Sequence, residues 1–488
     1  MSETAASETE LSFEAGAPTE LFDVIVIGAG SGNSIPSPEL AGLKIAIVDD
    51  GRWFGGTCLN AGCIPTKMFI HPARLVSHLR DAAHLGVTGT ASADWAAVRA
   101  RVFGRIDSIS QAGEQYRASG EPNVSLVRER VRFVDESTLV TASGRRLRGR
   151  ALVIGAGSRP RELRVLPFGP RVISSDDALR LETLPERITI IGGGVVASEF
   201  ASLYHGFGAK VTQLVRSTVL SSLDADIRAT FVAQAGAQWD IREHHDVVDA
   251  TIPDDATSPI RLVCNTGDVL ETDLVLVASG RVPNSDRLGT EVAGFDQELN
   301  GRLVVDAHQR VLRAGQALPN VFAMGDIANP HQLKHVANHE ARVVAENLRR
   351  TLVATSDNEE LVSNTLSPVP LAVFSTPEIA SFGATLTEAR DAGIDAVEVR
   401  QDYGGTAWGW ALEDQHHFAK LVVDRVQGQI LGAHIIGPDA AILLQPLVQA
   451  AAFNMPVQGL ARGQYWPHPA ATEIIENLLL NAKEECNA

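Results

Sequence analysis

The stretch Phe22-Asp-Val-Ile-Val-Ile-Gly28-Ala-Gly30-Ser-Gly32-Asn33 decides the fold of this chain. A short β-branched strand leads directly into a glycine turn, and such a continuous apolar strand is typical of a parallel sheet buried on both faces. Glycines at the turn let the backbone approach a pyrophosphate, whose charge then lies at the positive end of the following helix. The stretch therefore predicts a dinucleotide-binding unit with Gly28, Gly30 and Gly32 in its turn.

Two features outside this turn complete and modify the prediction. About 20 residues on, the strand Ile45-Ala-Ile-Val ends in two carboxylates, one of which suits the hydroxyl pair of a ribose. We choose Asp50, with Asp49 as the alternative. The third glycine of the fingerprint is replaced by Asn33, and prolines follow at positions 36 and 38, where each would cost a helix interior about 3 kcal/mol. We therefore expect the first helix to be short or displaced.

A second unit opens at Arg187-Ile-Thr-Ile-Ile-Gly192-Gly-Gly194-Val-Val-Ala197-Ser-Glu199, where Gly192, Gly194 and Ala197 fit the fingerprint. Its second strand, Val211 to Val215, ends in Arg216 instead of an acid. An arginine there can bind the 2′-phosphate of NADP, which a carboxylate would repel, so NADPH is favoured over NADH. Arg216 could alternatively be a solvated surface residue, and no second arginine follows in Ser217-Thr-Val-Leu-Ser-Ser222.

The motif Gly55-Gly-Thr-Cys58-Leu-Asn-Ala-Gly-Cys63-Ile-Pro-Thr-Lys67 carries the most chemistry. Residues five apart on a regular helix are separated by about 7.5 Å along its axis, whereas a disulfide needs Cα atoms within about 6.8 Å. Bridging the two cysteines thus requires a distorted turn, which Asn60, Ala61 and Gly62 could provide. A strained, accessible disulfide is the reducible kind. A metal site lacks further ligands nearby, so we expect none, and a purely structural pair is unusual in a reducing compartment.

Bulk composition limits the remaining possibilities. The chain has 488 residues, a net charge of −17 and four cysteines. The acidic balance argues against nucleic acid and against an anionic membrane surface as partners. The apolar runs are too short to span a bilayer, and Met1 to Glu20 resemble an acidic disordered tail more than a signal peptide. A cytoplasmic protein of about three domains is expected.

Further strands complete an α/β architecture. Turn-like sequence at Gly144 to Arg150 precedes a buried strand, Ala151 to Gly155, and two more strands end at Gly280-Arg281 and Gly325-Asp326. Thr351 to Asn364 has the polar composition of a linker. After it, strand-like runs at Leu371–Phe374, Ala419–Val423 and Ile430–Ile436 and helical patterns at Ala440–Phe453 and Ala470–Leu480 predict a separate α+β domain.

The order of these motifs, ending in a His-Pro motif at His468, resembles the class I pyridine nucleotide–disulfide oxidoreductases, the glutathione reductase family, from Leu21 to about Leu480. The resemblance implies an α/β fold of two Rossmann-like domains and a C-terminal α+β dimerisation domain. It implies a disordered tail (1–20), an FAD-binding domain in two parts (21–158 and 283–362), an NADPH-binding domain (159–282) and a dimerisation domain (363–488).

The resemblance also implies roles for individual residues. Cys58 would attack the substrate disulfide, Cys63 would lie against the flavin, and Lys67, paired with Glu199, would sit beside the flavin ring. Asp326 would bind the ribityl chain and Arg281 would lie near the nicotinamide nucleotide. His468 would be the acid–base, with Glu473 holding its ring and with the histidine supplied by the partner subunit of a homodimer. Alone, His468 could equally be a turn residue before a helix. The other cofactor-binding candidates are Gly56, Thr57, Gly157 and Gly280.

Four stretches are similar to the mycothione reductase subfamily in particular: residues 54–69, 102–107, 333–342 and 462–469. Even the unusual Gly30-Ser-Gly-Asn33 turn is similar to what that subfamily carries. The implied substrate is therefore the disulfide of mycothiol, a small molecule. The alternatives are dihydrolipoamide dehydrogenase, which would use NAD, another glutathione reductase-like enzyme, and a non-catalytic flavoprotein, against which the complete set of Cys58, Cys63, Lys67, His468 and Glu473 argues.

Overall fold

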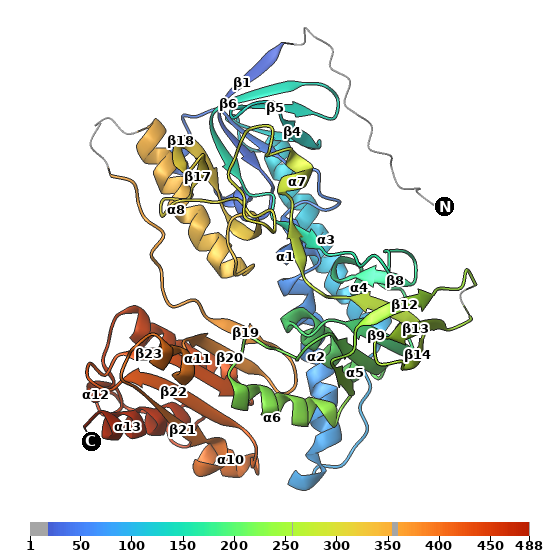
Figure 1. Ribbon diagram of the computed structural model, residues 1–488, viewed down its shortest axis with the longest axis vertical. Coiled ribbons are helices and arrows are strands. Elements are labelled where there is room, and N and C mark those ends of the chain that lie inside the picture. The colour runs from blue at the N-terminus through green and yellow to red at the C-terminus, as the bar shows by residue number, and fades with distance from the viewer. Residues whose placement is uncertain (1–17, 256, 354–359, 488) are drawn as a thin grey trace. The chain divides into compact units, whose positions relative to one another are not determined.

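The computed structural model describes residues 18–255, 257–353 and 360–487 (Figure 1). The expected tail and part of the expected linker therefore lie outside the described residues. The chain divides into two compact units, the first made of residues 1–65, 103–159 and 281–365 and the second of residues 66–102, 160–280 and 366–488. Residues 66–102 thus belong to the second unit, whereas the sequence placed them inside the first part of the FAD-binding domain.

The first unit is built on an eight-stranded sheet with the order β17-β18-β6-β1-β2-β3, to which β4 and β5 add an antiparallel extension. Strands β1, β2, β3, β6 and β18 run parallel, as the apolar runs predicted. The bounds are β1 Thr19–Ile27, β2 Ile45–Val48, β3 Val124–Val127, β4 Val131–Phe133, β5 Thr138–Thr141, β6 Arg146–Ile154, β17 Arg310–Arg313 and β18 Gln316–Ala323.

Successive residues of the central strands pack into two different cores, because side chains alternate across a sheet. Val24, Val26 and Ile45 face helix α8 (Lys334–Leu352). Ile25 and Ile27 belong to the core on the other face. Both faces of the central strands are therefore covered.

Two local predictions in this unit have clear outcomes. The first helix is indeed reduced to a single 3-10 turn, η1 (Ser31–Ser34), followed by a second short turn, η2 (Pro38–Leu40). The turn expected at Gly144 to Arg150 is wrong in its extent, since β6 already begins at Arg146. Its first residues alternate between exposed and buried side chains, so they form a half-buried strand that a search for continuous apolar runs overlooks.

The second unit contains a five-stranded parallel sheet with the order β11-β10-β9-β15-β8. A three-stranded antiparallel meander follows β11 in the chain, and Cys264 is buried in its middle strand. The bounds are β8 Val172–Ser174, β9 Arg187–Ile191, α5 Val195–Phe207, β10 Lys210–Val215, α6 Ala225–Gly236, β11 Asp240–Glu243, β12 Val247–Thr251, β13 Ile260–Cys264, β14 Val269–Thr272 and β15 Leu274–Val277.

The C-terminal part of this unit is an antiparallel sheet with the order β19-β20-β23-β22-β21, packed against helices α11 and α13. The sequence analysis missed two of its strands, β20 and β21. The bounds are β19 Leu371–Val373, β20 Ile379–Gly383, α9 Leu386–Asp391, β21 Ala396–Asp402, α10 Ala407–Ala411, β22 Phe418–Asp424, β23 Ile430–Ile436, α11 Ala440–Ala452, α12 Val457–Leu460 and α13 Glu473–Asn487.

A buried charge joins this sheet to the nucleotide-binding part of the same unit. Lys420 on β22 has a side chain that is only 5% exposed and contacts Asp224 (3.0 Å), which caps helix α6. The same ammonium reaches Asp226 (3.0 Å) and Glu398 on β21 (2.8 Å). Three carboxylates around one buried lysine compensate its desolvation.

Candidate active site

The helix that carries the two cysteines is broken between them. Helix α1 (Gly56–Asn60) ends at Ala61, with φ −146° and ψ 0°, and helix α2 (Cys63–Asp81) starts two residues later. Gly62 suits this break, because a Cβ there would lie 3.0 Å from the carbonyl oxygen of Thr57, a tight contact. Asn60 contributes through its side chain, whose Nδ2 donates to the carbonyls of Phe54 (2.8 Å) and Gly56 (3.0 Å).

The break brings the two thiols within hydrogen-bonding reach of each other. Cys58 is half-buried and Cys63 is exposed. The hydrogen bond with Cys63, together with burial, raises the pKa of Cys58 well above its usual range. The Lys334 ammonium and the backbone N–H of Ile64 act in the opposite direction. A dithiol in this arrangement needs a base before Cys58 can act as a thiolate.

The first glycine turn is closely packed on one side and open on the other. A Cβ on Gly28 (φ +101°) would lie 2.3 Å from the carbonyl oxygen of Gly155, and one on Gly56 would lie 2.6 Å from the Cα of Gly30. By contrast, a Cβ on Gly30 would meet nothing nearer than 3.9 Å, and one on Gly157 would meet nothing within 4 Å. A bound dinucleotide needs open space beside the glycines of such a turn, and Gly30 and Gly157 leave it. The turn therefore fits FAD.

The two aspartates after β2 have different environments. Asp49 is mostly buried, and its Oδ1 accepts a hydrogen bond from the backbone N–H of Ala29 inside the glycine turn (3.1 Å). Burial raises the pKa of Asp49 above its usual value. Asp50 is exposed and forms an ion pair with Arg130 at 3.2 Å. Geometry thus favours Asp49, the alternative in the sequence analysis, at the ribose of the dinucleotide.

Asp326 lies in the turn after β18, where Ser158 Oγ donates to its Oδ2 at 2.6 Å. Arg281 donates to Ser158 Oγ (2.7 Å) and Ser158 O (2.8 Å) and lies 4.0 Å from Asp326. Arg281 therefore contacts the first unit's predicted FAD residues. These contacts do not test the expected position of Arg281 near the nicotinamide nucleotide, which stays a prediction.

The sequence analysis missed Glu340, which positions the Asp326 turn. This carboxylate on α8 is 2% exposed and accepts hydrogen bonds from the backbone N–H of Gly325 (2.7 Å) and from Asn329 Nδ2 (2.9 Å). Burial raises its pKa. An isolated Glu in an amphipathic helix gives no sign of such a contact 15 residues away in sequence.

In the second unit, the turn at Gly192 to Gly194 leads directly into α5, whose first residue is Val195. Gly192 is packed as tightly as Gly28, since its Cβ would lie 2.3 Å from the carbonyl oxygen of Ala278. Gly194 has no neighbour within 4 Å of its Cβ position, and buried Ala197 lies in the first turn of the helix. Arg216 is exposed after β10. Among the described residues it has no ion-pair partner, which leaves it available to a phosphate.

Lys67 and Glu199 form the predicted pair. Lys67 Nζ lies 2.7 and 2.6 Å from the two carboxylate oxygens of Glu199 and 4.6 Å from the ring centre of Phe374. Glu199 is 5% exposed, and its Oε1 also accepts the N–H of Phe374 at 3.0 Å. These contacts hold the ammonium of Lys67, four residues after Cys63 on helix α2, in one place.

His468 and Glu473 also lie together, at the start of α13. The Nδ1 of His468 is 2.5 Å from Oε1 of Glu473, while the histidine side chain is 69% exposed. A carboxylate on Nδ1 fixes the ring and leaves Nε2 as the nitrogen that can exchange a proton. Cys486 lies on α13, where its thiol donates to the carbonyl of Asp424 (3.8 Å).

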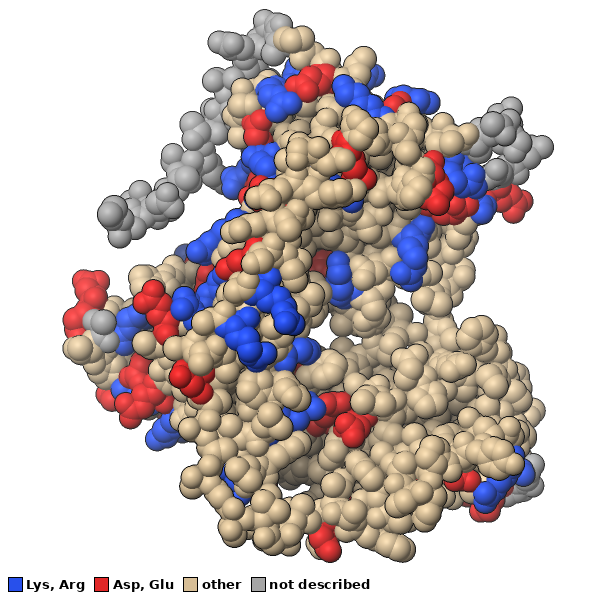
Figure 2. Space-filling model, turned by 180° about the vertical axis from the view of Figure 1, so that it is seen from behind, with Lys and Arg blue, Asp and Glu red and all other residues tan. Residues whose placement is uncertain are grey.

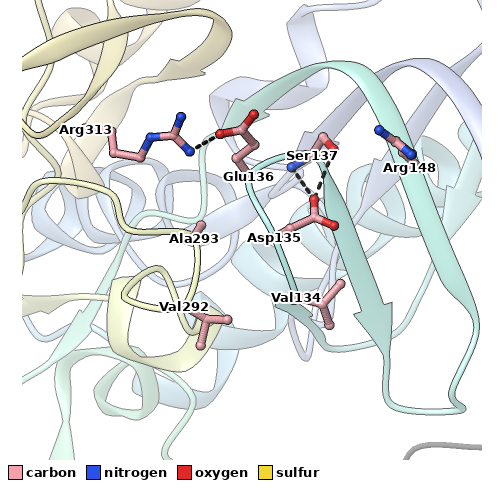
Figure 3. Close-up of a pocket in the computed structure, with 8 residues that line it drawn as sticks. All are labelled: Val134, Asp135, Glu136, Ser137, Arg148, Val292, Ala293 and Arg313. Atoms are coloured by element: carbon pink, nitrogen blue, oxygen red, sulfur yellow. Dashed lines mark hydrogen bonds and ion pairs between the residues drawn. The ribbon is translucent and has the colours of Figure 1, made fainter.

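A pocket elsewhere in the first unit contains none of the predicted site residues (Figure 3). Of its charged groups, Arg313 pairs with Glu136, and Asp135 accepts from the N–H (2.8 Å) and the hydroxyl (3.0 Å) of Ser137. In the part of the chain that the structure describes, no group of three or more His, Cys, Asp or Glu side chains could hold a metal ion. None of the described helices has the length and apolar character needed to cross a bilayer.

Comparisons with known proteins cover almost the whole chain. Residues 22–341 match the family model of pyridine nucleotide–disulphide oxidoreductases, and residues 369–479 match the dimerisation domain of that family. A mycothione reductase of Mycobacterium tuberculosis is 42% identical over 95% of this chain and 100% of its own length. A glutathione reductase of Burkholderia cepacia is 32% identical, over 88% of this chain and 92% of its own.

Solved structures give the same result. An HOCl-induced flavoprotein disulfide reductase from Escherichia coli superposes with a TM-score of 0.80 at 25% identity, covering 94% of this chain and 99% of its own.

Proposed function

The chain belongs to the class I pyridine nucleotide–disulfide oxidoreductases and is a flavoprotein disulfide oxidoreductase, and from this premise we propose that it uses NADPH to reduce mycothione, the disulfide of mycothiol. The observation that carries the proposal is the broken helix that brings the Cys58 and Cys63 thiols together. The choice of substrate rests on the similarity to the mycothione reductase of Mycobacterium tuberculosis.

Residues of this chain would hold both cofactors. The first glycine turn, Asp49, Thr57, Gly157 and Asp326 would bind FAD, and the second turn with Arg216 would bind NADPH. FAD, when bound, takes a hydride from NADPH and supplies the electron pair that reduces the Cys58–Cys63 disulfide. Lys67, held by Glu199, places a fixed positive charge on helix α2, four residues after Cys63.

The remaining steps belong to the side chains. His468 removes the proton from Cys58, whose thiolate attacks one sulfur of the substrate disulfide and forms a mixed disulfide. The departing thiolate takes a proton from His468 and leaves as the first thiol. Cys63 then attacks Cys58, the second thiol leaves, and the protein disulfide forms again. Each cycle consumes NADPH, one proton and one disulfide and yields NADP⁺ and two thiols.

The first experiment compares substrates. Steady-state oxidation of NADPH and NADH is measured with mycothione, glutathione disulfide and lipoamide. We expect the highest kcat/KM for NADPH with mycothione. A better rate with lipoamide and NAD(H) would instead identify a dihydrolipoamide dehydrogenase.

The second experiment tests the cysteines. Cys58→Ser or Cys63→Ser is expected to lower disulfide reduction at least about 1,000-fold, because each sulfur makes and breaks a covalent bond in every cycle. Cys264→Ser is the matched control, since Cys264 is buried in β13. Unchanged turnover in either active-site variant contradicts the proposed function.

We also propose a cytoplasmic homodimer in which His468 acts on the cysteines of the partner subunit. The C-terminal domain exposes large apolar side chains, including Trp410 (66%), Ile442 (69%) and Phe453 (74%). Figure 2 shows few charged residues over that part of the chain. Such exposed apolar surface is typical of a protein–protein interface.

Mixed dimers test this arrangement. If His468 acts in the partner, a dimer of one Cys58→Ser chain and one His468→Ala chain retains one complete site and about half of the wild-type rate. If both groups act within one chain, that mixed dimer is as inactive as either parent variant.

A further inference from the structure

The first glycine turn lacks the element that normally places positive charge at a pyrophosphate. A helix contributes partial positive charge through the aligned peptide dipoles and free N–H groups of its first turn. The second turn is followed by the 13-residue helix α5, but the first is followed by two short 3-10 turns, the four residues of η1 and the three of η2. An FAD bound at the first turn would therefore lack much of this stabilisation.

A lysine from a distant part of the same unit lies against this turn. Lys334, the first residue of helix α8, donates from Nζ to the hydroxyl of Ser31, the residue between Gly30 and Gly32, at 2.9 Å. Ser31 in turn donates to Oδ1 of Asn338 at 3.1 Å. Lys334 and Asn338 are four residues apart, so both side chains project from the same face of the helix.

The charge of Lys334 is not neutralised by any protein group that the structure describes. The side chain is partly buried, and within the described residues it has a hydroxyl partner but no carboxylate. A partly desolvated ammonium with only a neutral partner is costly unless an anion completes its environment. Lys420, which is buried in the C-terminal sheet, shows the usual solution, with three carboxylates around it.

The position of Lys334 relative to the start of helix α1 is consistent with a ligand there. Gly56, at the start of the cysteine helix, packs so closely on Gly30 that a Cβ would not fit. The Lys334 ammonium is near enough to Cys58 for its charge to oppose the rise in the pKa of that thiol. Lys334, Ser31, Gly30 and Gly56 thus lie close together at the glycine turn.

We propose that Lys334, oriented by Ser31 and Asn338, binds the diphosphate of FAD and takes over the role of the missing first helix. This inference rests on the FAD site of the proposed function and adds to it a residue outside the glycine turn. The alternative is that the Lys334 ammonium contacts the isoalloxazine ring of FAD, which becomes anionic on reduction. A positive charge at the diphosphate stabilises oxidised and reduced FAD alike, whereas a positive charge at the ring stabilises mainly the reduced form.

The test measures FAD affinity and flavin potential separately. FAD release from the oxidised holoenzyme is followed by flavin fluorescence at several salt concentrations, and the two-electron potential is measured by equilibration with a reference dye. For Lys334→Met we expect the dissociation constant of oxidised FAD to rise about 10- to 100-fold, since a charge-assisted hydrogen bond is lost. The salt dependence should become shallower, while the potential should stay that of the wild type, because the diphosphate charge is the same in both oxidation states.

Two further variants control for charge and folding. Lys334→Arg keeps the positive charge and should restore most of the affinity even if Lys334→Met is poorly folded. Lys44→Met removes an exposed lysine of the same unit, stacked on Phe22, and should leave FAD affinity unchanged.

The outcomes separate this inference from the proposed function. A well-folded Lys334→Met protein with wild-type affinity for oxidised FAD would overturn the inference, and a lowered potential at unchanged affinity would place the charge at the ring instead. Failure of Lys334→Arg to bind FAD better than Lys334→Met would also overturn it. A wild-type protein without bound FAD would contradict the proposed function itself.

Discussion

The two glycine turns begin alike and are completed by different means. Gly28 and Gly192 both occupy positions where a Cβ would lie 2.3 Å from a backbone oxygen, so strand and turn are equally tight in both. After that point the second turn continues into α5, whereas the first stops after one 3-10 turn. The first turn is instead held by side chains from distant segments.

Arg117 and Lys334 supply this support in the first turn. Arg117 on α3 (Trp95–Ser119) donates to Oδ1 (2.8 Å) and to the backbone oxygen (2.7 Å) of Asn33, the residue that replaces the third glycine. Lys334 reaches Ser31 from α8. The same binding task can thus be met by a local helix or by tertiary contacts, and the second solution depends more strongly on single side chains.

The largest effect is expected where the two turns are the same. Gly28→Ala adds a Cβ against Gly155 and requires an alanine at φ +101°. Over-packing and backbone strain each cost about 1–3 kcal/mol, so we expect a loss of about 3 kcal/mol or more and a protein purified without FAD. Gly30→Ala is the matched control, because its Cβ has space: that variant should keep its thermal unfolding midpoint and lose only FAD affinity. Equal stability of both variants would show that the tight contact is not needed.

Arg117→Ala tests whether side chains support the first turn. Arg117 is 8% exposed, and its removal leaves the oxygens of Asn33 and the carboxylate of Glu121 without their partner. We expect a loss of about 2–3 kcal/mol in the free energy of unfolding and weaker FAD binding. Thermal unfolding and flavin fluorescence measure the two effects. A change below about 0.5 kcal/mol, the usual range for surface substitutions, would mean that η1 holds its own conformation.

Arg216→Ala sharpens the assignment of the second turn. If the arginine binds the 2′-phosphate, KM for NADPH should rise about 10- to 100-fold, the value of one strong charge-assisted contact, while kcat/KM for NADH stays unchanged. Steady-state kinetics with both nucleotides provide the measurement. An equal loss with NADH would contradict a role at the 2′-phosphate.

The smallest effect is expected in the helix of the second turn. Ala197→Gly should cost only about 1 kcal/mol, the helix-propensity difference between the two residues, and should raise KM for NADPH less than Arg216→Ala does. Thermal unfolding of the NADPH-free protein measures the change. A loss as large as that of Arg117→Ala would show that the second turn is no more robust than the first.

These contacts also mark the limit of what the sequence could predict. The glycine turns, the broken cysteine helix and the shortened first helix follow from local sequence, and all are confirmed. The partners of Asn33 and Ser31 are 84 and 303 residues away in the chain, and no local pattern identifies them. The choice between Asp49 and Asp50 likewise depends on which of the two side chains faces the glycine turn. Two adjacent aspartates in the sequence do not show which one that is.

The missed strands have a simpler explanation. β21 alternates polar and apolar residues in part of its length, and β20 is only five residues long. Neither strand has the continuous apolar run that identifies a strand of a parallel sheet, because both strands pair antiparallel.

The lysine enclosed by Asp224, Asp226 and Glu398 has a consequence for cooperativity. Separating helix α6 from the C-terminal sheet would expose a buried ammonium and strand its counter-ions, so local opening at that junction carries a high free-energy cost. Amide protons on both sides of it should exchange with deuterium through the same opening event. The nucleotide-binding part of the second unit and its C-terminal sheet then form a single foldon, even though a family boundary separates them in the sequence.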